Sequence, residues 1–311
     1  MSSTSRASTR DKDSVNAPKP KKKDLPAPLV QEFRRLFDEA KRATDDKGRK
    51  ISSAKWGVYA FFDYDGEPIY VGQTHEQLST RLNRHLTNQR TDAVAMRILD
   101  IFEVAEVQMW PVWELQDVSA RDHDALRLLD AYEYSAYLAA IRDSKFGAIL
   151  NEKIPPISEE IELPESYRFP LISDETRLER GHADVRIARR AQTISRLSAV
   201  AHERGEVSDG LRRVLVIQAV RLAYLSAARL AEVEGRPMPD PSAISVEGLV
   251  GTVLYEHSDP HGQSRAHAPG ASALLPWRCA PVDTSHRGSL WPTRRWNRDG
   301  PLSPAALCFF I

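Results

Sequence analysis

Two short aromatic segments on either side of a turn sequence constrain the fold of this chain most. Residues 56–62 (WGVYAFF) are aromatic and β-branched, and residues 68–72 (PIYVG) form a second apolar segment. Between them, residues 63–66 (DYDG) have the composition of a turn. The pattern predicts a β-hairpin with Tyr59 on one strand and Tyr70 on the other. We expect the pairing register to bring both phenols to one face.

A basic helix is predicted directly after this hairpin, over residues 75–90. Its core-facing side chains repeat at every fourth position: Leu78, Leu82 and Leu86. Arg81 and His85 are also four residues apart, so they share a face beside this stripe. With Arg84, Arg90 and Arg97, they make a candidate phosphate-binding surface, because guanidinium groups pair bidentately with phosphate oxygens. A solvated charged face without a ligand is the alternative.

Further elements follow this helix. Residues 92–100 suggest a short helix, and residues 104–115 predict a third strand. Pro111 lies within that strand and lacks the N–H that a central strand needs, so we expect an edge position or a bulge there.

A longer helix after the third strand carries a carboxylate in an unusual place. Ser119 is a reasonable N-cap for it, and its apolar residues fall at steps of three and four. Glu133 lies within that apolar stripe. Because an unpaired buried charge is costly, either an arginine forms a structural ion pair with Glu133 or a cation binds there.

The order of these elements resembles the GIY-YIG nuclease family. The resemblance covers roughly residues 55–155, and its motifs are Gly57-Val58-Tyr59, Tyr70-Val71-Gly72, Arg81 with His85, Glu133, and Asn151 in ILNEKIPP. It implies an α+β fold with a small three-stranded antiparallel sheet flanked by helices. It also implies hydrolysis of DNA phosphodiester bonds with one Mg²⁺ or Mn²⁺ ion.

The same resemblance assigns roles to the matching residues. Glu133 would hold the metal ion, and Arg81 would neutralise charge on the scissile phosphate. Tyr59 would act as general base or orient the attacking water, while Tyr70 and His85 position Tyr59 and the phosphate. Asn151 would orient its neighbours through amide hydrogen bonds.

Three residues depart from the family pattern. Val58 and Val71 replace isoleucines and keep the β-branched apolar character of a buried strand. Gln73 stands where many members have a lysine, so a lysine that assists the leaving group or the water is missing at this position. Arg84 is one residue that could compensate.

The rest of the chain divides by composition. We expect a disordered basic arm over 1–25, an N-terminal helix within 26–50, the nuclease domain over 51–155 and a Pro-rich linker over 156–181. Residues 182–240 predict a helical hairpin, interpreted either as a DNA-contacting or dimerising unit or as a buttress on the nuclease domain. Residues 241–311 are expected to be an irregular, disordered tail.

Composition limits the functional class. The chain has 43 basic and 43 acidic side chains, so any nucleic-acid surface must be local. Its two cysteines exclude a disulfide scaffold and a cysteine-rich zinc module. We expect a cytoplasmic protein with DNA as partner and no membrane association. Restriction or another defence role is favoured, with a homodimer and a partner methyltransferase as open possibilities. The alternatives are a structure-specific repair nuclease, a mobile-element nuclease, or a non-catalytic DNA-binding protein that keeps the fold.

Overall fold

The aromatic segments form the hairpin that the sequence predicts. In the computed structural model, which describes residues 27–86 and 100–256, β1 (Gly57–Phe62) and β2 (Pro68–Thr74) pair antiparallel. Tyr59 lies opposite Gly72, and Phe61 lies opposite Tyr70. Directly opposed residues of two strands share a face. Both tyrosines therefore point to the same side of the sheet.

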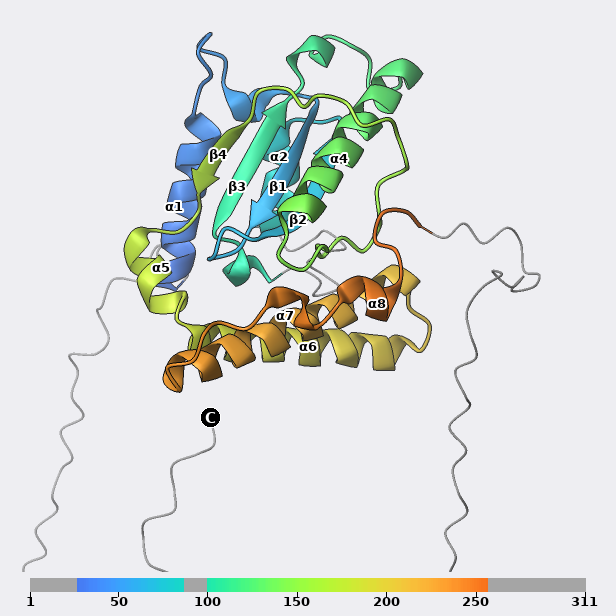
Figure 1. The fold of residues 1–311 in the computed structure, drawn as a ribbon. Helices are drawn as coiled ribbons and strands as arrows, with labels where there is room; N and C mark the ends of the chain where they lie inside the picture. Colours follow the sequence, from blue (N-terminus) through green and yellow to red (C-terminus); the bar gives the residue numbers. More distant parts are fainter. Residues whose placement is uncertain (1–26, 87–99, 257–311) are drawn as a thin grey trace, which may run out of the picture. The chain divides into compact units, whose positions relative to one another are not determined.

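The sheet has four antiparallel strands in the order β2-β1-β3-β4, so the predicted count of three is wrong (Figure 1). The third strand, β3 (Glu106–Pro111), is found where it was expected. The additional strand, β4 (Tyr167–Pro170), lies in the predicted linker. β4 is only four residues long and alternates between half-buried and exposed side chains. This weak pattern, next to prolines, gives little signal of a strand.

Pro111 is tolerated because β3 is central over only part of its length. β4 pairs with β3 from Glu106 to Met109, so Pro111 has a strand partner only on the side of β1, at Gly57. The missing N–H of Pro111 therefore interrupts no ladder on the side of β4. The expectation of an edge position holds for this residue and is wrong for the strand as a whole.

Helices cover both faces of the sheet. The face of Tyr59 packs on α1 (Pro28–Arg42) and α2 (Leu78–Leu86), and the opposite face packs on α4 (His123–Asp143). α4 begins after Asp122 and not after Ser119, because the Asp122 carboxylate accepts hydrogen bonds from the backbone N–H groups of Asp124 and Ala125. The site described below lies where α2 and α4 meet the free edge of β2 (Figure 1).

The C-terminal half contains more regular structure than the sequence suggests. The helical hairpin is confirmed as α6 (Ala183–Arg204) and α7 (Asp209–Val233). Residues predicted to be irregular also contain α5 (Asp174–Arg180) and α8 (Val246–Val250). Single-turn 3₁₀ helices complete the described elements at Ile51–Ser53, Ile101–Glu103, Trp113–Leu115 and Pro241–Ala243. The basic arm, the predicted 92–100 helix except its last residue, and residues 257–311 lie outside the described residues.

The helices α6 and α7 dock on the turn of the β1–β2 hairpin through buried charges. Asp63 Oδ2 accepts hydrogen bonds from Nη2 of Arg186, Arg190 and Arg221 at 3.0, 2.8 and 3.1 Å. All four side chains are buried. The three cations hold the pKa of Asp63 below its usual value despite burial, which acts in the opposite direction. The hairpin of helices is therefore a buttress on the sheet, one of its two predicted interpretations.

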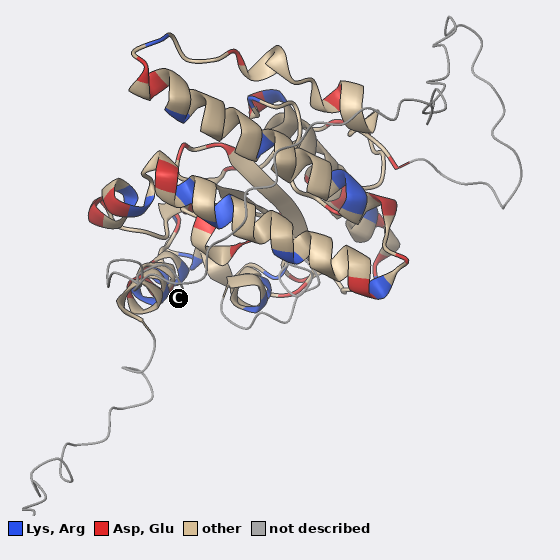
Figure 2. Cartoon of the chain, turned by 90° about the horizontal axis from the view of Figure 1, so that it is seen from below, with Lys and Arg blue, Asp and Glu red and all other residues tan. Residues whose placement is uncertain are grey.

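The apolarity of α7 and the distribution of charged residues around it are both relevant to function. By length and composition alone α7 could cross a membrane, and 39% of its most apolar window is buried within the protein. Seen from the side of α6 and α7, basic and acidic residues of the described chain are interspersed (Figure 2). This mixture agrees with the zero net charge and leaves phosphate recognition to local clusters.

Candidate active site

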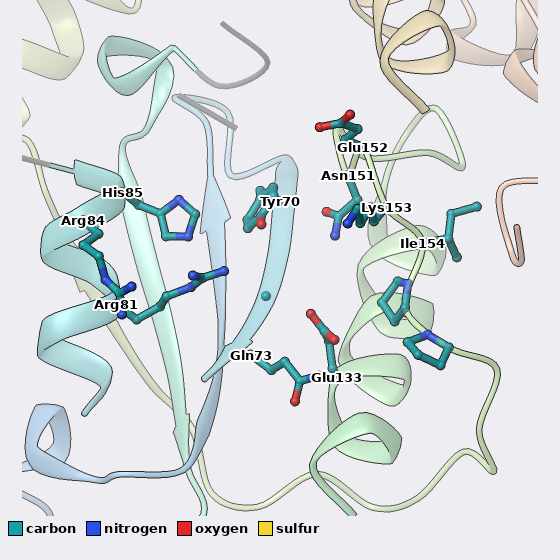
Figure 3. Close-up of a pocket in the computed structure, with 13 residues that line it drawn as sticks. Tyr70, Gln73, Arg81, Arg84, His85, Glu133, Asn151, Glu152, Lys153 and Ile154 are labelled. Carbon is teal, nitrogen blue, oxygen red and sulfur yellow. The ribbon is translucent and has the colours of Figure 1, made fainter. Parts of the chain in front are cut away.

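A pocket at the free edge of β2 collects most of the residues that the sequence singled out. Its volume is about 590 Å³. Arg81, Arg84 and His85 of α2 lie on one side, residues 151–154 lie on the other, and Tyr70 and Glu133 lie between them (Figure 3). Elements that are far apart in the sequence thus meet around one cavity.

Tyr59 is buried behind the pocket wall that α2 forms, where it contacts two residues of that helix. Its side chain has 0% exposure, and it is not among the residues that line the pocket. The phenol oxygen lies 2.7 Å from His85 Nε2 and accepts a hydrogen bond from Arg81 Nε at 3.2 Å. The Tyr59 and Tyr70 rings stack with centroids 6.3 Å apart. Tyr59 therefore links the arginine and the histidine, and Tyr70 is the phenol that reaches the pocket.

The environment holds these groups in their uncharged forms. Burial raises the pKa of Tyr59 well above its usual value, and the nearby Tyr70 adds to the effect. Burial also raises the pKa of Tyr70 to about 12. Burial and the adjacent Arg81 lower the pKa of His85 to about 3. Near neutral pH, His85 Nε2 can therefore accept the Tyr59 O–H while the Tyr59 oxygen accepts from Arg81.

Glu133 projects from α4 into the same pocket and is partly buried. Burial raises its pKa to about 7 and the charge of Asp130 adds to the rise, whereas Arg81 and hydrogen bonds from Gln73 oppose it. No arginine or lysine of the described chain forms an ion pair with Glu133. Of the two interpretations of this carboxylate, the structural ion pair is not found among the described residues.

The donor atoms around Glu133 suit one hard divalent cation. Its carboxylate and the buried Gln73 Oε1, which has no hydrogen-bond partner, are both oxygen ligands of the kind that Mg²⁺ and Mn²⁺ prefer. The described residues contain no group of three or more His, Cys, Asp or Glu side chains suited to a metal. Glu133 would thus be the main protein ligand, and water or substrate would supply the others.

Asn151 braces the edge of β2. Its side-chain Oδ1 accepts from Val71 N at 3.0 Å, and its Nδ2 donates to Val71 O at 2.8 Å. Leu150 N also donates to Ile69 O at 2.8 Å. The Asn151 amide thus satisfies both the N–H and the C=O of Val71 on the edge strand. Asn151 therefore orients the backbone next to Tyr70, and not a side chain of the site.

The structure places some of the other predicted site residues at the pocket and does not describe the rest. Arg84 lines the pocket and forms an ion pair with Glu76, so its charge is already partnered. Arg90 and Arg97 lie outside the described residues. Gln73 Nε2 donates to Asp130 Oδ1 at 2.6 Å, which holds this glutamine between β2 and α4.

Two residues were missed by sequence reasoning: Asp130, which contacts Gln73 beside the pocket, and Lys153, which lines the pocket. Asp130 lies three residues before Glu133, so helical spacing alone could have placed both carboxylates on one face. Lys153 also lines the pocket and lies in the same ILNEKIPP segment as Asn151. No spacing rule points to Lys153, because it lies in a loop.

Gly72 is required by the packing of Tyr59. A Cβ atom on Gly72 would lie 2.6 Å from the Tyr59 phenol oxygen and 2.7 Å from Cζ. Gly72→Ala is therefore expected to displace the phenol and break the contacts with Arg81 and His85. A variant that retains native far-ultraviolet circular dichroism but has lost most of the DNA-cleavage rate that the family resemblance implies would meet this expectation. An unchanged rate would show that the position of Tyr59 does not matter.

Comparison with known proteins agrees with this geometry. Residues 55–120 match the family model described as the GIY-YIG catalytic domain. The match includes Tyr59, Tyr70, Arg81 and His85 and ends before Glu133. Comparison with curated proteins and with solved structures gave no match. The matched motifs and the pocket that they line identify residues 55–120 as part of a GIY-YIG catalytic domain.

Proposed function

We propose that this protein is a divalent-metal-dependent endonuclease that hydrolyses DNA phosphodiester bonds. The observation that carries the proposal is the meeting of Glu133 with Tyr70, Arg81 and His85 around one pocket. Glu133 lies outside the segment matched by the family model, so its position in this pocket is an independent observation. Phosphodiester hydrolysis needs charge stabilisation at the phosphate and an oxygen ligand for a metal ion, and the pocket offers both.

Arg81 is the proposed phosphate ligand. Its hydrogen bond to Tyr59 uses Nε, which leaves both Nη groups for the phosphate oxygens. Because the guanidinium is anchored at one nitrogen, little reorganisation is needed when negative charge develops in the transition state. Tyr59 and His85 act as the positioning residues of Arg81.

The phenol that meets the substrate is proposed to be Tyr70. The buried Tyr59 has no surface on the pocket and a strongly raised pKa, which does not favour the role of general base that the resemblance implied. Tyr70 lines the pocket and keeps its proton at neutral pH, so it can donate a hydrogen bond to the phosphate or to the attacking water. Glu133 is proposed to hold the metal ion. The bound ion would polarise the phosphoryl oxygen and stabilise the leaving oxygen.

For the biological role we propose restriction or another defence function, in the cytoplasm. The support is indirect: the helical buttress adds no zinc module within the described residues, and α6 and α7 are integral to the nuclease fold. A restriction role would require a partner methyltransferase. Sequencing the ends produced from modified and unmodified genomic DNA separates the alternatives. A repair or mobile-element nuclease would cut both substrates alike.

The purified protein is expected to nick or cut plasmid DNA with Mg²⁺ or Mn²⁺ and to be inactive with EDTA. Arg81→Ala is expected to lower the single-turnover rate about 10²–10³-fold, the cost of removing one preorganised donor. Arg142→Ala is the matched control, because Arg142 lies on an exposed part of α4 and pairs with Glu160. DNA binding without cleavage under any metal would favour the non-catalytic alternative.

A further inference from the structure

The far wall of the pocket is a loop that is held in place from two directions. This pocket-wall segment (residues 149–156) follows α4, and Leu150 and Asn151 attach it to β2. Residues 154 and 155 are buried, although the segment has no regular secondary structure. A loop pinned in this way presents its remaining side chains at defined positions.

The helical buttress fixes the other side of the same segment. Ser208 Oγ donates to Glu152 Oε1 at 2.6 Å, and Arg213 Nη2 donates to Glu152 O at 2.8 Å. Glu256 Oε1 accepts from Ile154 N at 2.9 Å. A Cβ on Gly210 would collide with the Glu152 carbonyl, so the start of α7 lies directly against this backbone. The residues on both sides of Lys153 are therefore anchored.

Lys153 itself is exposed and lines the pocket. The other cations of the pocket already have partners, since Arg81 donates to Tyr59 and Arg84 pairs with Glu76. Within the described residues, no hydrogen bond or ion pair involves the Lys153 ammonium group. The rigid wall thus carries a cation with no partner, on the side of the pocket opposite Arg81 (Figure 3).

We propose that Lys153 binds a phosphate of the nucleic-acid substrate from this wall, so that the strand lies between Lys153 and Arg81. The inference rests on the proposed function for the identity of the substrate. An ammonium group is a compact point charge that suits a phosphate without demanding bidentate geometry. In this proposal, α7 and Glu256 not only stabilise the fold but also position the pocket-wall segment that carries Lys153.

The test is a comparison of Lys153→Ala, Lys153→Arg and the control Lys145→Ala. Lys145 is an exposed lysine that does not line this pocket, so its removal changes the net charge equally. Binding to a short labelled DNA duplex is measured in EDTA over a range of salt concentrations. Loss of one phosphate contact is expected to reduce the slope of log affinity against log salt by about 0.9. Affinity at low salt should fall several-fold, and Lys153→Arg should restore both values.

The outcomes separate this inference from the proposed function. If Lys153→Ala and Lys145→Ala give the same slope and affinity, Lys153 makes no specific phosphate contact and the proposal is wrong. Failure of the unchanged protein to bind DNA would also overturn it. If that protein binds DNA but does not cleave it with any metal, the nuclease proposal fails while the comparison of slopes still decides the role of Lys153.

Discussion

Glu133→Gln is expected to eliminate cleavage and, at the same time, to stabilise the metal-free protein. Removing the carboxylate removes the proposed metal ligand, and loss of metal-assisted charge stabilisation should lower the rate on the order of 10³-fold or more. The raised pKa means that ionised Glu133 destabilises the folded state. At pH above about 7, the neutral glutamine should therefore add on the order of 2 kcal/mol to the free energy of unfolding.

The pH dependence tests this interpretation. A carboxyl group whose folded pKa is raised costs stability above that pKa, and the cost disappears as the pH falls through about 7 toward the unfolded value. The metal-free parent should gain stability over this range, relative to Glu133→Gln, in chemical denaturation. Glu162→Gln, at an exposed position, is the control. Full cleavage by Glu133→Gln would exclude Glu133 as the metal ligand.

Asp63→Asn is expected to destabilise the folded protein strongly. Asparagine keeps the shape of the side chain but removes the charge that faces Arg186, Arg190 and Arg221. Asp65, Glu67 and Glu103 still face these arginines, so the substitution removes one partner of a buried charge cluster, which costs about 3–5 kcal/mol. The thermal midpoint should fall on the order of 10 °C for a domain of this size.

Asp65→Asn is the matched control for that substitution. Asp65 lies in the same turn and pairs with Arg186 Nη1 at 2.6 Å, but its side chain is 46% exposed. Its removal should cost no more than about 1 kcal/mol, because solvent screens the pair. Both midpoints can be measured by differential scanning calorimetry. Equal losses from the two substitutions would show that the buried cluster contributes no more than a surface ion pair.

The local features of the site could be predicted from the sequence. The hairpin pattern led to the expectation that Tyr59 and Tyr70 share a face, which the pairing register bears out, and helical spacing placed Arg81 beside His85. Glu133 was recognised because a carboxylate in an apolar stripe conflicts with burial. In each case the periodicity of a strand or helix carries the information.

Features that depend on long-range contacts could not be predicted. Asp63 is separated from its three arginines by more than a hundred residues, and no periodicity links them. The strand β4 forms because β3 offers an open edge, not because its own four residues favour a strand strongly. Lys153 belongs to the pocket because β2 on one side, and α7 and Glu256 on the other, hold its loop.

The docking of α6 and α7 also limits how the domains of this protein can be exchanged. The same two helices hold the tip of the tyrosine hairpin through Asp63 and the opposite pocket wall through Glu152. A transplanted fragment that ends after the matched motifs would expose the apolar surface that packs on α6 and α7, leave Asp63 without its arginine partners and lack the pocket wall that carries Glu152. Gene fusion or domain exchange would therefore have to transfer the sheet and the helical buttress as one piece.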